Sequence, residues 1–171
     1  MCGIVGYIGD KDALPILING LRRLEYRGYD SAGCAFLQNG ELKVIKKQGR
    51  LQILEDLLSD EGYLPAADKP LSQTNINMGI GHTRWATHGE PSDVNAHPHL
   101  SQSGRFAVVH NGIIENYISL KKKLESKGFE FISETDTEVI AHLFEYYYKG
   151  DIMDTMIKVI NRVEGSYALG V

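Results

Sequence analysis

The chain has 171 residues, of which 43% are hydrophobic and 23% are charged, and its formal net charge is −4. This length suits one ordinary domain, and the composition is that of a globular protein in water, so we expect a cytoplasmic protein with no membrane partner. The negative charge argues against nucleic acid as a partner, because a phosphate backbone is bound by a clustered basic surface.

The first half of the sequence predicts strands and helices in turn. An apolar run over residues 4–8 is typical of a buried strand, and apolar residues at helical spacing follow over 14–24. Asn-Gly at 39–40 predicts a hairpin turn between two strands. Residues 51–58 predict a short amphipathic helix. The polar, proline-containing residues 59–75 predict a surface segment to which no structure can be assigned.

The second half predicts two more strands, over 78–83 and 105–110, with a turn-rich loop between them. Three helices are expected next. Their signals are an apolar face from Tyr117 that ends before a glycine, a capping box from Thr135 to Glu138, and apolar spacing over 152–163. The sequence ends in an apolar, strand-like segment, and the paired strands followed by helices indicate the α+β class.

Cys2 is a candidate nucleophile because it stands at the start of the chain. Removal of Met1 would leave a free α-amine and a thiol on one residue. Their ordinary pKa values, about 8 and about 8.5, are close enough for the amine to act as a general base for the thiol. The alternative is a small apolar residue at the start of a strand. Gly3, which permits close approach, and the apolar Ile4 and Val5, which would anchor the terminus, favour the nucleophile.

The histidines are a second group of candidates. Five of the six fall between His82 and His110, and His97 and His99 flank a proline like a chelating pair. A hydrolytic zinc site would need such histidines together with carboxylates and an open coordination position. Since no HExxH or comparable motif accompanies them, we predict structural or substrate-contacting histidines and no cofactor, with a metallohydrolase using His97 and His99 as an alternative.

Polar residues that follow predicted strands supply the remaining candidates. Asn111 and Gly112 follow an apolar strand, and their amides suit a developing oxyanion, although an Asn-Gly turn is the alternative. Arg84 and Trp85 follow another strand, where the arginine would bind a carboxylate beneath a mobile tryptophan, or else form a structural ion pair beside a core tryptophan. Asp136 would bind a cation, or stand as an acid at a helix start.

Six ordered blocks, which cover most of the chain, together resemble one family. They are Cys-Gly-Ile-Val-Gly at 2–6, Leu-Glu-Tyr-Arg-Gly-Tyr-Asp-Ser-Ala-Gly at 24–33, His-Thr-Arg-Trp-Ala-Thr-His-Gly at 82–89, Asn-Ala-His-Pro-His at 95–99, His-Asn-Gly-Ile-Ile-Glu-Asn at 110–116 and Ser-Glu-Thr-Asp-Thr-Glu at 133–138. The chain resembles the N-terminal glutaminase domains of the glutamine–fructose-6-phosphate aminotransferases, a branch of the class II (N-terminal nucleophile) glutamine amidotransferases. The Cys-Gly-Ile start alone is shared with other branches of that class.

The resemblance implies both a fold and an activity. The family fold is that of the N-terminal nucleophile hydrolases, a four-layer αββα sandwich with two antiparallel sheets. Cys2 would attack the side-chain amide of L-glutamine and form a glutamyl thioester, which water hydrolyses to glutamate while ammonia is released. In full-length members the ammonia serves to convert fructose 6-phosphate to glucosamine 6-phosphate.

The resemblance also implies roles for the residues around Cys2. Asn111 and Gly112 look like the oxyanion hole of the family, and Asp136 would hold the α-ammonium group of glutamine. The other positions lie on the substrate side: Arg84, with Thr87 and His88 nearby, at the α-carboxylate, Arg27 near the nucleophile, and Trp85 as a gate for ammonia.

Two departures from the family are expected. Residues 1–171 match a glutaminase domain without its last strands and without the two sugar-phosphate isomerase domains, to which the homodimer or higher oligomer of the family is credited. A retained Met1 would block the α-amine of Cys2 and remove its base. A catalytically silent glutamine-binding fragment is therefore the main alternative to a glutaminase.

Overall fold

A computed structural model describes residues 2–64 and 75–171. Met1 and residues 65–74 of the unassigned segment lie outside the described residues. The elements in chain order are β1 (Gly3–Ile8), α1 (Ala13–Leu24), the 3₁₀ helix η1 (Glu25–Arg27), β2 (Ser31–Gln38), β3 (Glu41–Gln48), α2 (Leu51–Asp60), β4 (Met78–Arg84), β5 (His99–Leu100), β6 (Ala107–Ile114), α3 (Tyr117–Glu125), α4 (Glu138–Tyr147), α5 (Ile152–Ile160) and β7 (Gly165–Gly170).

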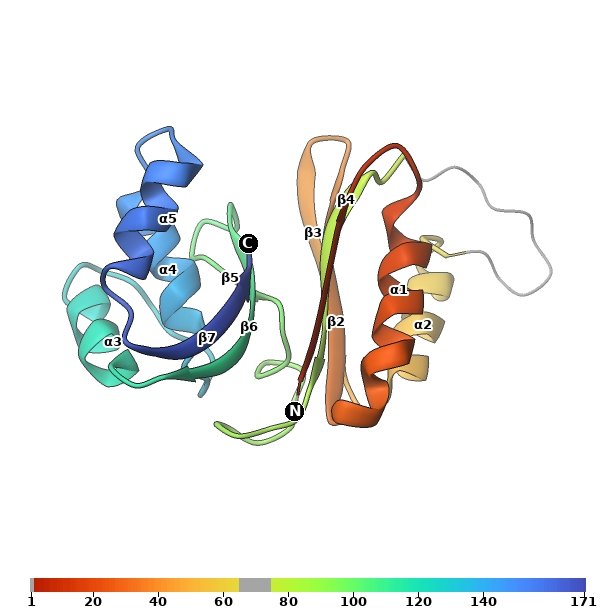
Figure 1. The fold of residues 1–171 in the computed structure, drawn as a ribbon, viewed down its shortest axis with the longest axis horizontal. Helices are drawn as coiled ribbons and strands as arrows, with labels where there is room; N and C mark the ends of the chain where they lie inside the picture. Colours follow the sequence, from red (N-terminus) through yellow and green to blue (C-terminus); the bar gives the residue numbers. More distant parts are fainter. Residues whose placement is uncertain (1, 65–74) are drawn as a thin grey trace.

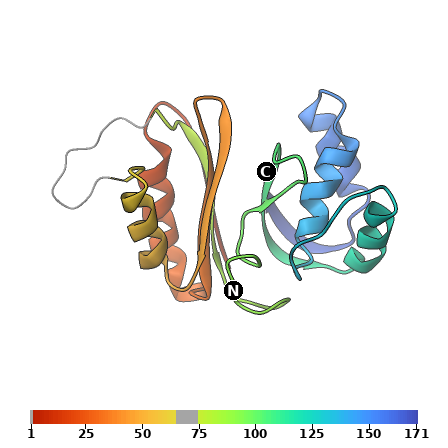
Figure 2. The same ribbon diagram turned by 180° about the vertical axis from the view of Figure 1, so that it is seen from behind.

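The described residues are arranged in four layers, helix, sheet, sheet and helix (Figure 1). The first sheet has the strand order β1-β4-β2-β3 and the second has the order β5-β6-β7, and their paired strands are antiparallel. Helices α1 and α2 cover the outer face of the first sheet, and α3, α4 and α5 cover that of the second, as the view from behind also shows (Figure 2). The predicted four-layer α+β sandwich is confirmed.

The first helical layer is built from signals that the sequence carries locally. The Asp12 carboxylate accepts a hydrogen bond from the backbone of Leu14 at 3.4 Å, and the apolar face of α1 is buried against the sheet. The hairpin between β2 and β3 turns at Asn39 and Gly40, with φ of 52° and 80°. Positive φ at both positions is the geometry for which an Asn-Gly pair is suited, so this prediction is confirmed.

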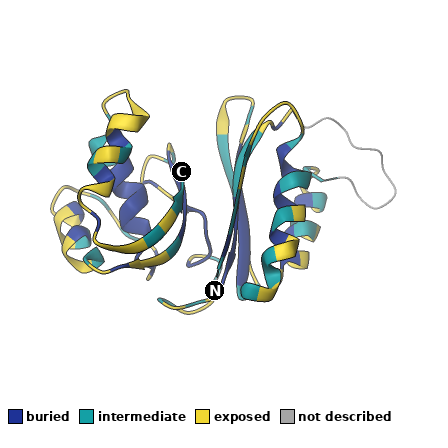
Figure 3. Ribbon diagram, in the orientation of Figure 1, coloured by how far each residue is buried: buried dark blue, intermediate teal, exposed yellow. Residues whose placement is uncertain are grey.

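The second helical layer is centred on α4. Its residues from Glu138 to Phe144 are all buried, and they pack with β6, α3 and α5 into one apolar cluster. Figure 3 shows this burial along α4 and on the side of α1 that faces its sheet. Two separate cores, one under each helical layer, therefore hold the helices on the outer faces of the two sheets.

The structure corrects four local predictions. Strand β6 continues through Asn111 and Gly112 to Ile114, so the Asn-Gly pair forms no turn. Helix α4 begins at Glu138, and Thr135 does not cap it, because the Glu138 carboxylate accepts from the backbone nitrogen of Ser133 at 2.7 Å instead. Helix α5 ends at Ile160, and the loop before β6 contains the short strand β5.

The described ends of the unassigned segment are packed against the first core. Tyr63 stacks edge-to-face on Phe36 with 5.0 Å between ring centroids, Leu64 packs beside it, and Ile76 is fully buried. Within the predicted surface segment 59–75, α2 continues to Asp60, Glu61, Gly62 and Asn75 are exposed, and Tyr63 and Leu64 are half-buried; Ile76 lies just after it. Apolar residues separated from any periodic run gave no local signal of this packing.

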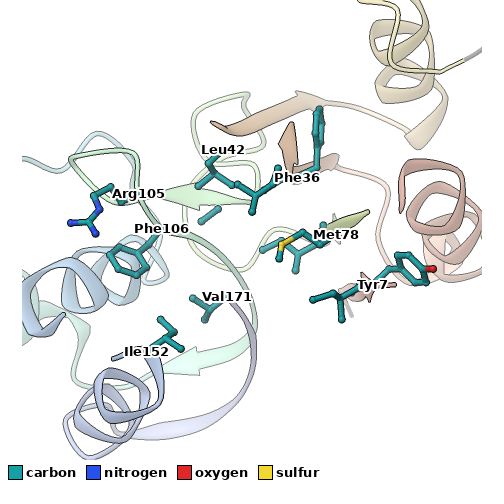
Figure 4. A pocket seen from close by; sticks show the side chains of 15 residues that line it. Tyr7, Phe36, Leu42, Met78, Arg105, Phe106, Ile152 and Val171 are labelled. Atoms are coloured by element: carbon teal, nitrogen blue, oxygen red, sulfur yellow. The ribbon is translucent and has the colours of Figure 1, made fainter. Parts of the chain in front are cut away.

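An apolar cavity of about 520 Å³ lies between the two sheets. Phe36 and Met78 line it from the first sheet, and Phe106, Ile152 and Val171 line it from the second half of the chain (Figure 4). No helix among the described residues is long and apolar enough to cross a membrane.

Candidate functional site

Cys2 lies at the edge of the first sheet, beside the end of β4. The antiparallel register pairs Gly3 with Thr83, which brings the preceding residue of β1 next to the residues after β4. The backbone nitrogen of Trp85 donates to Cys2 Sγ at 3.2 Å, and the thiol is partly buried.

Asn111 and Gly112 approach Cys2 from β6 in the second sheet. Asn111 Nδ2 donates to the carbonyl oxygen of Cys2 at 3.2 Å. Gly112 has φ of 127°, and a Cβ there would collide with the Ser166 carbonyl oxygen and lie 2.8 Å from Tyr167 Cα. Only glycine fits this place. An amide side chain and an exposed backbone therefore stand next to each other close to the candidate nucleophile.

Arg84, at the end of β4, is only 3% exposed and organises the loop that follows. Its guanidinium donates to the carbonyl oxygens of His88 and Gly89, the latter at 3.1 Å. Burial lowers the pKa of Arg84, whereas the nearby charges of Cys2, Asp30 and Asp136 act to raise it. The arginine is thus the buried cation that these acidic groups face.

Asp136 lies in the loop before α4 and bridges to β6. Its Oδ2 atom accepts from the backbone nitrogen of Ile114 at 2.8 Å, and its side chain is almost fully buried. Because α4 begins at Glu138, the alternative of an acid in the first helical turn is wrong. Asp136 is a buried carboxylate between β6 and α4, which suits it to a cationic partner.

The remaining predicted residues lie around this centre. Trp85 is 43% exposed and packs edge-to-face on Tyr29 with 5.3 Å between ring centroids, so it is not a core residue. Arg27, in η1, donates from Nε to the Tyr26 hydroxyl at 2.7 Å. Two residues of the loop after β4 complete the set: Thr87, which is exposed, and His88, whose ring is 6.0 Å from that of Tyr117.

Three histidines form a buried cluster that runs from β4 to the start of α4, and the sequence did not predict its arrangement. His82 Nε2 lies 2.8 Å from Asn111 Oδ1, and His82 Nδ1 lies 3.2 Å from His97 Nδ1. His97 Nε2 and His110 Nδ1 lie 2.9 and 2.8 Å from the hydroxyl oxygen of Thr137. Burial lowers the pKa of His82 to about 4 and that of His97 well below 6.5, and it also lowers the pKa of His110. The only sequence signal of this cluster was the concentration of histidines.

The geometry disfavours the alternative of a metal at His97 and His99. Both nitrogens of His97 face hydrogen-bonding partners, and His99 Nε2 lies 3.1 Å from Thr135 Oγ1. Within the described ranges, no three His, Cys, Asp or Glu side chains are grouped as metal ligands. The donor atoms that a metal would use are already engaged within the protein.

Comparisons with known proteins indicate the family of the chain. The pattern of the family described as "Glutamine amidotransferase domain" matches residues 82–171. Glutamine–fructose-6-phosphate aminotransferase [isomerizing] of Caldanaerobacter subterraneus subsp. tengcongensis is 63% identical over all 171 residues, and that of Aquifex aeolicus is 52% identical. The chain covers 26% and 27% of these relatives, so it spans about a quarter of their length.

A solved structure of another amidotransferase has a similar fold. Glutamine phosphoribosylpyrophosphate amidotransferase from B. subtilis, complexed with ADP and GMP, is 28% identical with a TM-score of 0.77. The match covers 99% of this chain and 34% of that one. The four-layer fold is therefore shared with a solved amidotransferase.

Proposed function

Because this chain belongs to the glutamine amidotransferase domain family, we propose that it hydrolyses the side-chain amide of L-glutamine with Cys2 as the nucleophile. The observation that carries the proposal is the contact of the Asn111 side chain with the backbone of Cys2. The Asn111 Nδ2 donor reaches the backbone of Cys2 at 3.2 Å from the opposite sheet. A nucleophile and a hydrogen-bond donor for the developing oxyanion are thus held on two different rigid elements.

The proposed reaction has two steps. The Cys2 sulfur adds to the amide carbon, and the oxyanion is held by Asn111 Nδ2 and the backbone nitrogen of Gly112. The thiol proton passes through the α-amine of Cys2 to the amide nitrogen, the C–N bond breaks, and ammonia leaves a glutamyl thioester. Water then cleaves the thioester to give glutamate and the free thiol. The amine is available for this only after Met1 is removed.

The proposed substrate contacts use the buried charges. Arg84, with Thr87 and His88, would hold the α-carboxylate of glutamine, and Asp136 would hold its α-ammonium group. The electrostatic attraction between Arg84 and Asp136 supports a site for a molecule with both charges. Substrates that lack the free amino-acid group would leave a buried charge unpaired, at a cost of several kcal/mol, about 3–5.

Two more residues have proposed roles at the mouth of the site. Arg27 lies in η1, just before Gly28, where a Cβ would lie 2.8 Å from the Arg84 carbonyl carbon. This close packing supports a place for Arg27 near the nucleophile. The exposed Trp85, whose backbone nitrogen contacts Cys2 Sγ, is proposed to gate the passage of ammonia.

For the whole protein we propose the activity of its named relatives, glutamine–fructose-6-phosphate aminotransferase. The ammonia would then convert fructose 6-phosphate to glucosamine 6-phosphate, a step of amino-sugar formation, in isomerase domains that are not part of these residues. The high identity along the entire chain supports this branch over others in the class. Residues 1–171 are proposed to be the larger part of one glutaminase domain of a cytoplasmic homo-oligomer.

Covalent labelling tests the glutaminase step. A diazo-ketone analogue of glutamine should add to Cys2 and block release of glutamate and ammonia, and the adduct should be absent from Cys2→Ala and present in the matched variant Cys34→Ala. Intact mass of the same sample reports whether Met1 has been removed. Tight binding of glutamine to protein that has lost Met1, without adduct or turnover, would identify a silent binding domain and overturn the proposal.

A charge substitution tests the substrate contacts separately. Asp136→Asn keeps an oxygen that can accept from the backbone of Ile114 but removes the negative charge. We expect KM for glutamine to rise by about tenfold or more while the folded state persists, because a charged hydrogen bond is lost. An unchanged KM would show that the ammonium group binds elsewhere.

A further inference from the structure

The buried histidines are linked by a chain of hydrogen bonds. The carbonyl oxygen of His110 determines which atom donates in each of these bonds. His82 Nε2 lies 3.1 Å from the carbonyl oxygen of His110 and 2.8 Å from Asn111 Oδ1. A backbone carbonyl oxygen carries no proton and can only accept. The hydrogen in this bond must therefore belong to His82 Nε2.

The state of His82 then fixes that of His97. Burial lowers the pKa of His82 to about 4, so at neutral pH the ring is neutral and carries one N–H. With that hydrogen on Nε2, His82 Nδ1 can only accept, and His97 Nδ1, 3.2 Å away, must donate to it. The neutral His97 ring is left with an accepting Nε2.

Thr137 and His110 complete the chain. The Thr137 hydroxyl is 2.9 Å from His97 Nε2, which can only accept, so the hydroxyl proton goes there. Thr137 Oγ1 is left to accept from His110 Nδ1 at 2.8 Å. The contact between this hydroxyl and Asp136 Oδ1 is longer, 3.5 Å, and does not compete for the proton.

The hydrogen on His82 Nε2 also determines the orientation of Asn111 in the candidate oxyanion hole. A donor at His82 Nε2 requires the oxygen of the Asn111 carboxamide to face it, which turns Nδ2 toward Cys2. We propose that His82, held in one tautomer by His97 and Thr137, is a positioning residue that orients the Asn111 amide for catalysis. This inference rests on the proposed function of Asn111. The opposite orientation of the carboxamide would present an oxygen lone pair to a developing oxyanion and repel it.

The four residues of this hydrogen-bond chain are shielded from water. His82, His97, His110 and Thr137 are all buried. The loop that carries His97 lies directly on β2, where a Cβ at Gly33 would collide with the His97 carbonyl oxygen. Hydrogen bonds shielded from water are stronger and hold a single geometry, so the amide is oriented before substrate arrives.

The tautomers can be read without any activity measurement. Long-range ¹H–¹⁵N correlation spectra of the intact protein labelled at histidine nitrogen distinguish the two ring nitrogens of each residue. We expect a neutral ring at neutral pH with hydrogen on Nε2 of His82, Nδ1 of His97 and Nδ1 of His110. Hydrogen on Nδ1 of His82, or a positively charged His82 ring, would overturn the inference whether or not the protein is a glutaminase.

A pair of substitutions at Thr137 tests the effect on catalysis in the intact protein. Thr137→Val keeps the shape but removes the hydroxyl, and Thr137→Ser restores it. We expect kcat of glutamine hydrolysis to fall by about tenfold or more in Thr137→Val, with KM within about threefold, and to recover in Thr137→Ser. Thr155→Val is the matched control, because Thr155 is a buried threonine of α5 that donates to the Asp151 carbonyl oxygen outside the chain of histidines.

The outcomes separate this inference from the proposed function. If the parent protein hydrolyses glutamine and Thr137→Val keeps its kcat, the positioning role is wrong and the function stands. The same holds if Thr137→Ser is as slow as Thr137→Val, since the effect then lies in packing rather than in the hydroxyl. If the parent protein does not hydrolyse glutamine, the proposed function fails, and the tautomers alone decide whether the chain of hydrogen bonds exists. The same spectra decide if Thr137→Val does not fold.

Discussion

Acidification from pH 7 to pH 5 is expected to destabilise the fold through its buried histidines. Burial lowers the pKa of His82 from 6.5 to about 4, and it lowers those of His97 and His99 well below 6.5. The unfolded chain therefore binds these protons more readily than the folded protein does. The stability that each ring contributes is fully present above pH 6.5 and is lost as the pH falls toward the folded pKa.

The magnitude follows for His82 from the two pKa values. At pH 5 the ring is almost fully protonated in the unfolded chain and almost fully neutral in the fold. With about 1.4 kcal/mol for each pKa unit, the free energy of unfolding falls by about 2 kcal/mol between pH 7 and pH 5. Burial lowers the pKa values of His97 and His99 as well, so both are expected to add to this loss. The loss from His82 alone is already a sizeable part of the whole stability of about 5–15 kcal/mol of an ordinary domain.

The carboxylate of Glu138 changes the stability of the fold at lower pH than the histidines do. Burial raises the pKa of Glu138, but hydrogen bonds from His142, Ile132 and Ser133 outweigh it and bring the pKa to about 2. A lowered carboxyl pKa stabilises the fold above its unfolded value of 4.5, and that stability is lost only as the pH falls from there toward 2. The loss between pH 7 and pH 5 is therefore assigned to the histidines.

Urea unfolding followed by circular dichroism at several pH values between 5 and 8 measures this loss. His99→Gln keeps a side-chain donor for Thr135 and removes one titrating ring, so its loss between pH 7 and pH 5 should be smaller than that of the parent protein. Thr155→Val, in contrast, should lower the free energy of unfolding equally at every pH. A free energy of unfolding that is constant from pH 7 to pH 5, or a His99→Gln protein that loses as much as the parent, would refute the reasoning.

Two further predictions concern glycine and cysteine. In denaturant unfolding, Gly40→Ala should lower the free energy of unfolding by roughly 1 kcal/mol, whereas Gly112→Ala should lower it by well above that or prevent stable folding. Both glycines have positive φ, but only at Gly112 would a Cβ collide with Ser166. Equal losses in the two variants would contradict this. Iodoacetamide should modify Cys2 in the native protein and reach Cys34 only after unfolding, because Cys34 is buried and burial raises its pKa to about 12. Peptide mass analysis measures the order of modification, and modification of Cys34 before Cys2 would contradict the prediction.

The parts of the fold that the sequence predicted are those whose causes are local. The helical spacing of α1 and the Asn39-Gly40 turn need no distant partner, and both were predicted correctly. The start of α4 was missed because distant partners compete with the local pattern. Thr135 Oγ1 pairs with His99 rather than capping a helix, and no property of residues 135–138 alone indicates this.

The candidate site was predictable only by chemistry and resemblance. Cys2, Arg84, Asn111 and Asp136 were selected by residue type and by matching motifs, and the structure gathers them around the meeting of the two sheets. The spacing of these residues in the sequence could not predict which strands lie opposite each other and bring them together. Asn111 reaches a residue 109 positions earlier in the chain because β6 lies opposite β1, and that contact follows from sheet packing.

The position of His82 on β4 explains why the histidines and Arg84 belong to one unit. Alternate residues of a strand point to the same face, so His82 and Arg84 both face the second sheet, while Thr83 between them faces Leu24 and the helical layer. Strand β4 therefore presents the His82 ring and the Arg84 guanidinium to β6 next to each other. A shift of this strand by one residue would turn both away together. The antiparallel partners on either side, β1 and β2, hold that register, so Cys2, which directly precedes β1, is aligned by the same pairing.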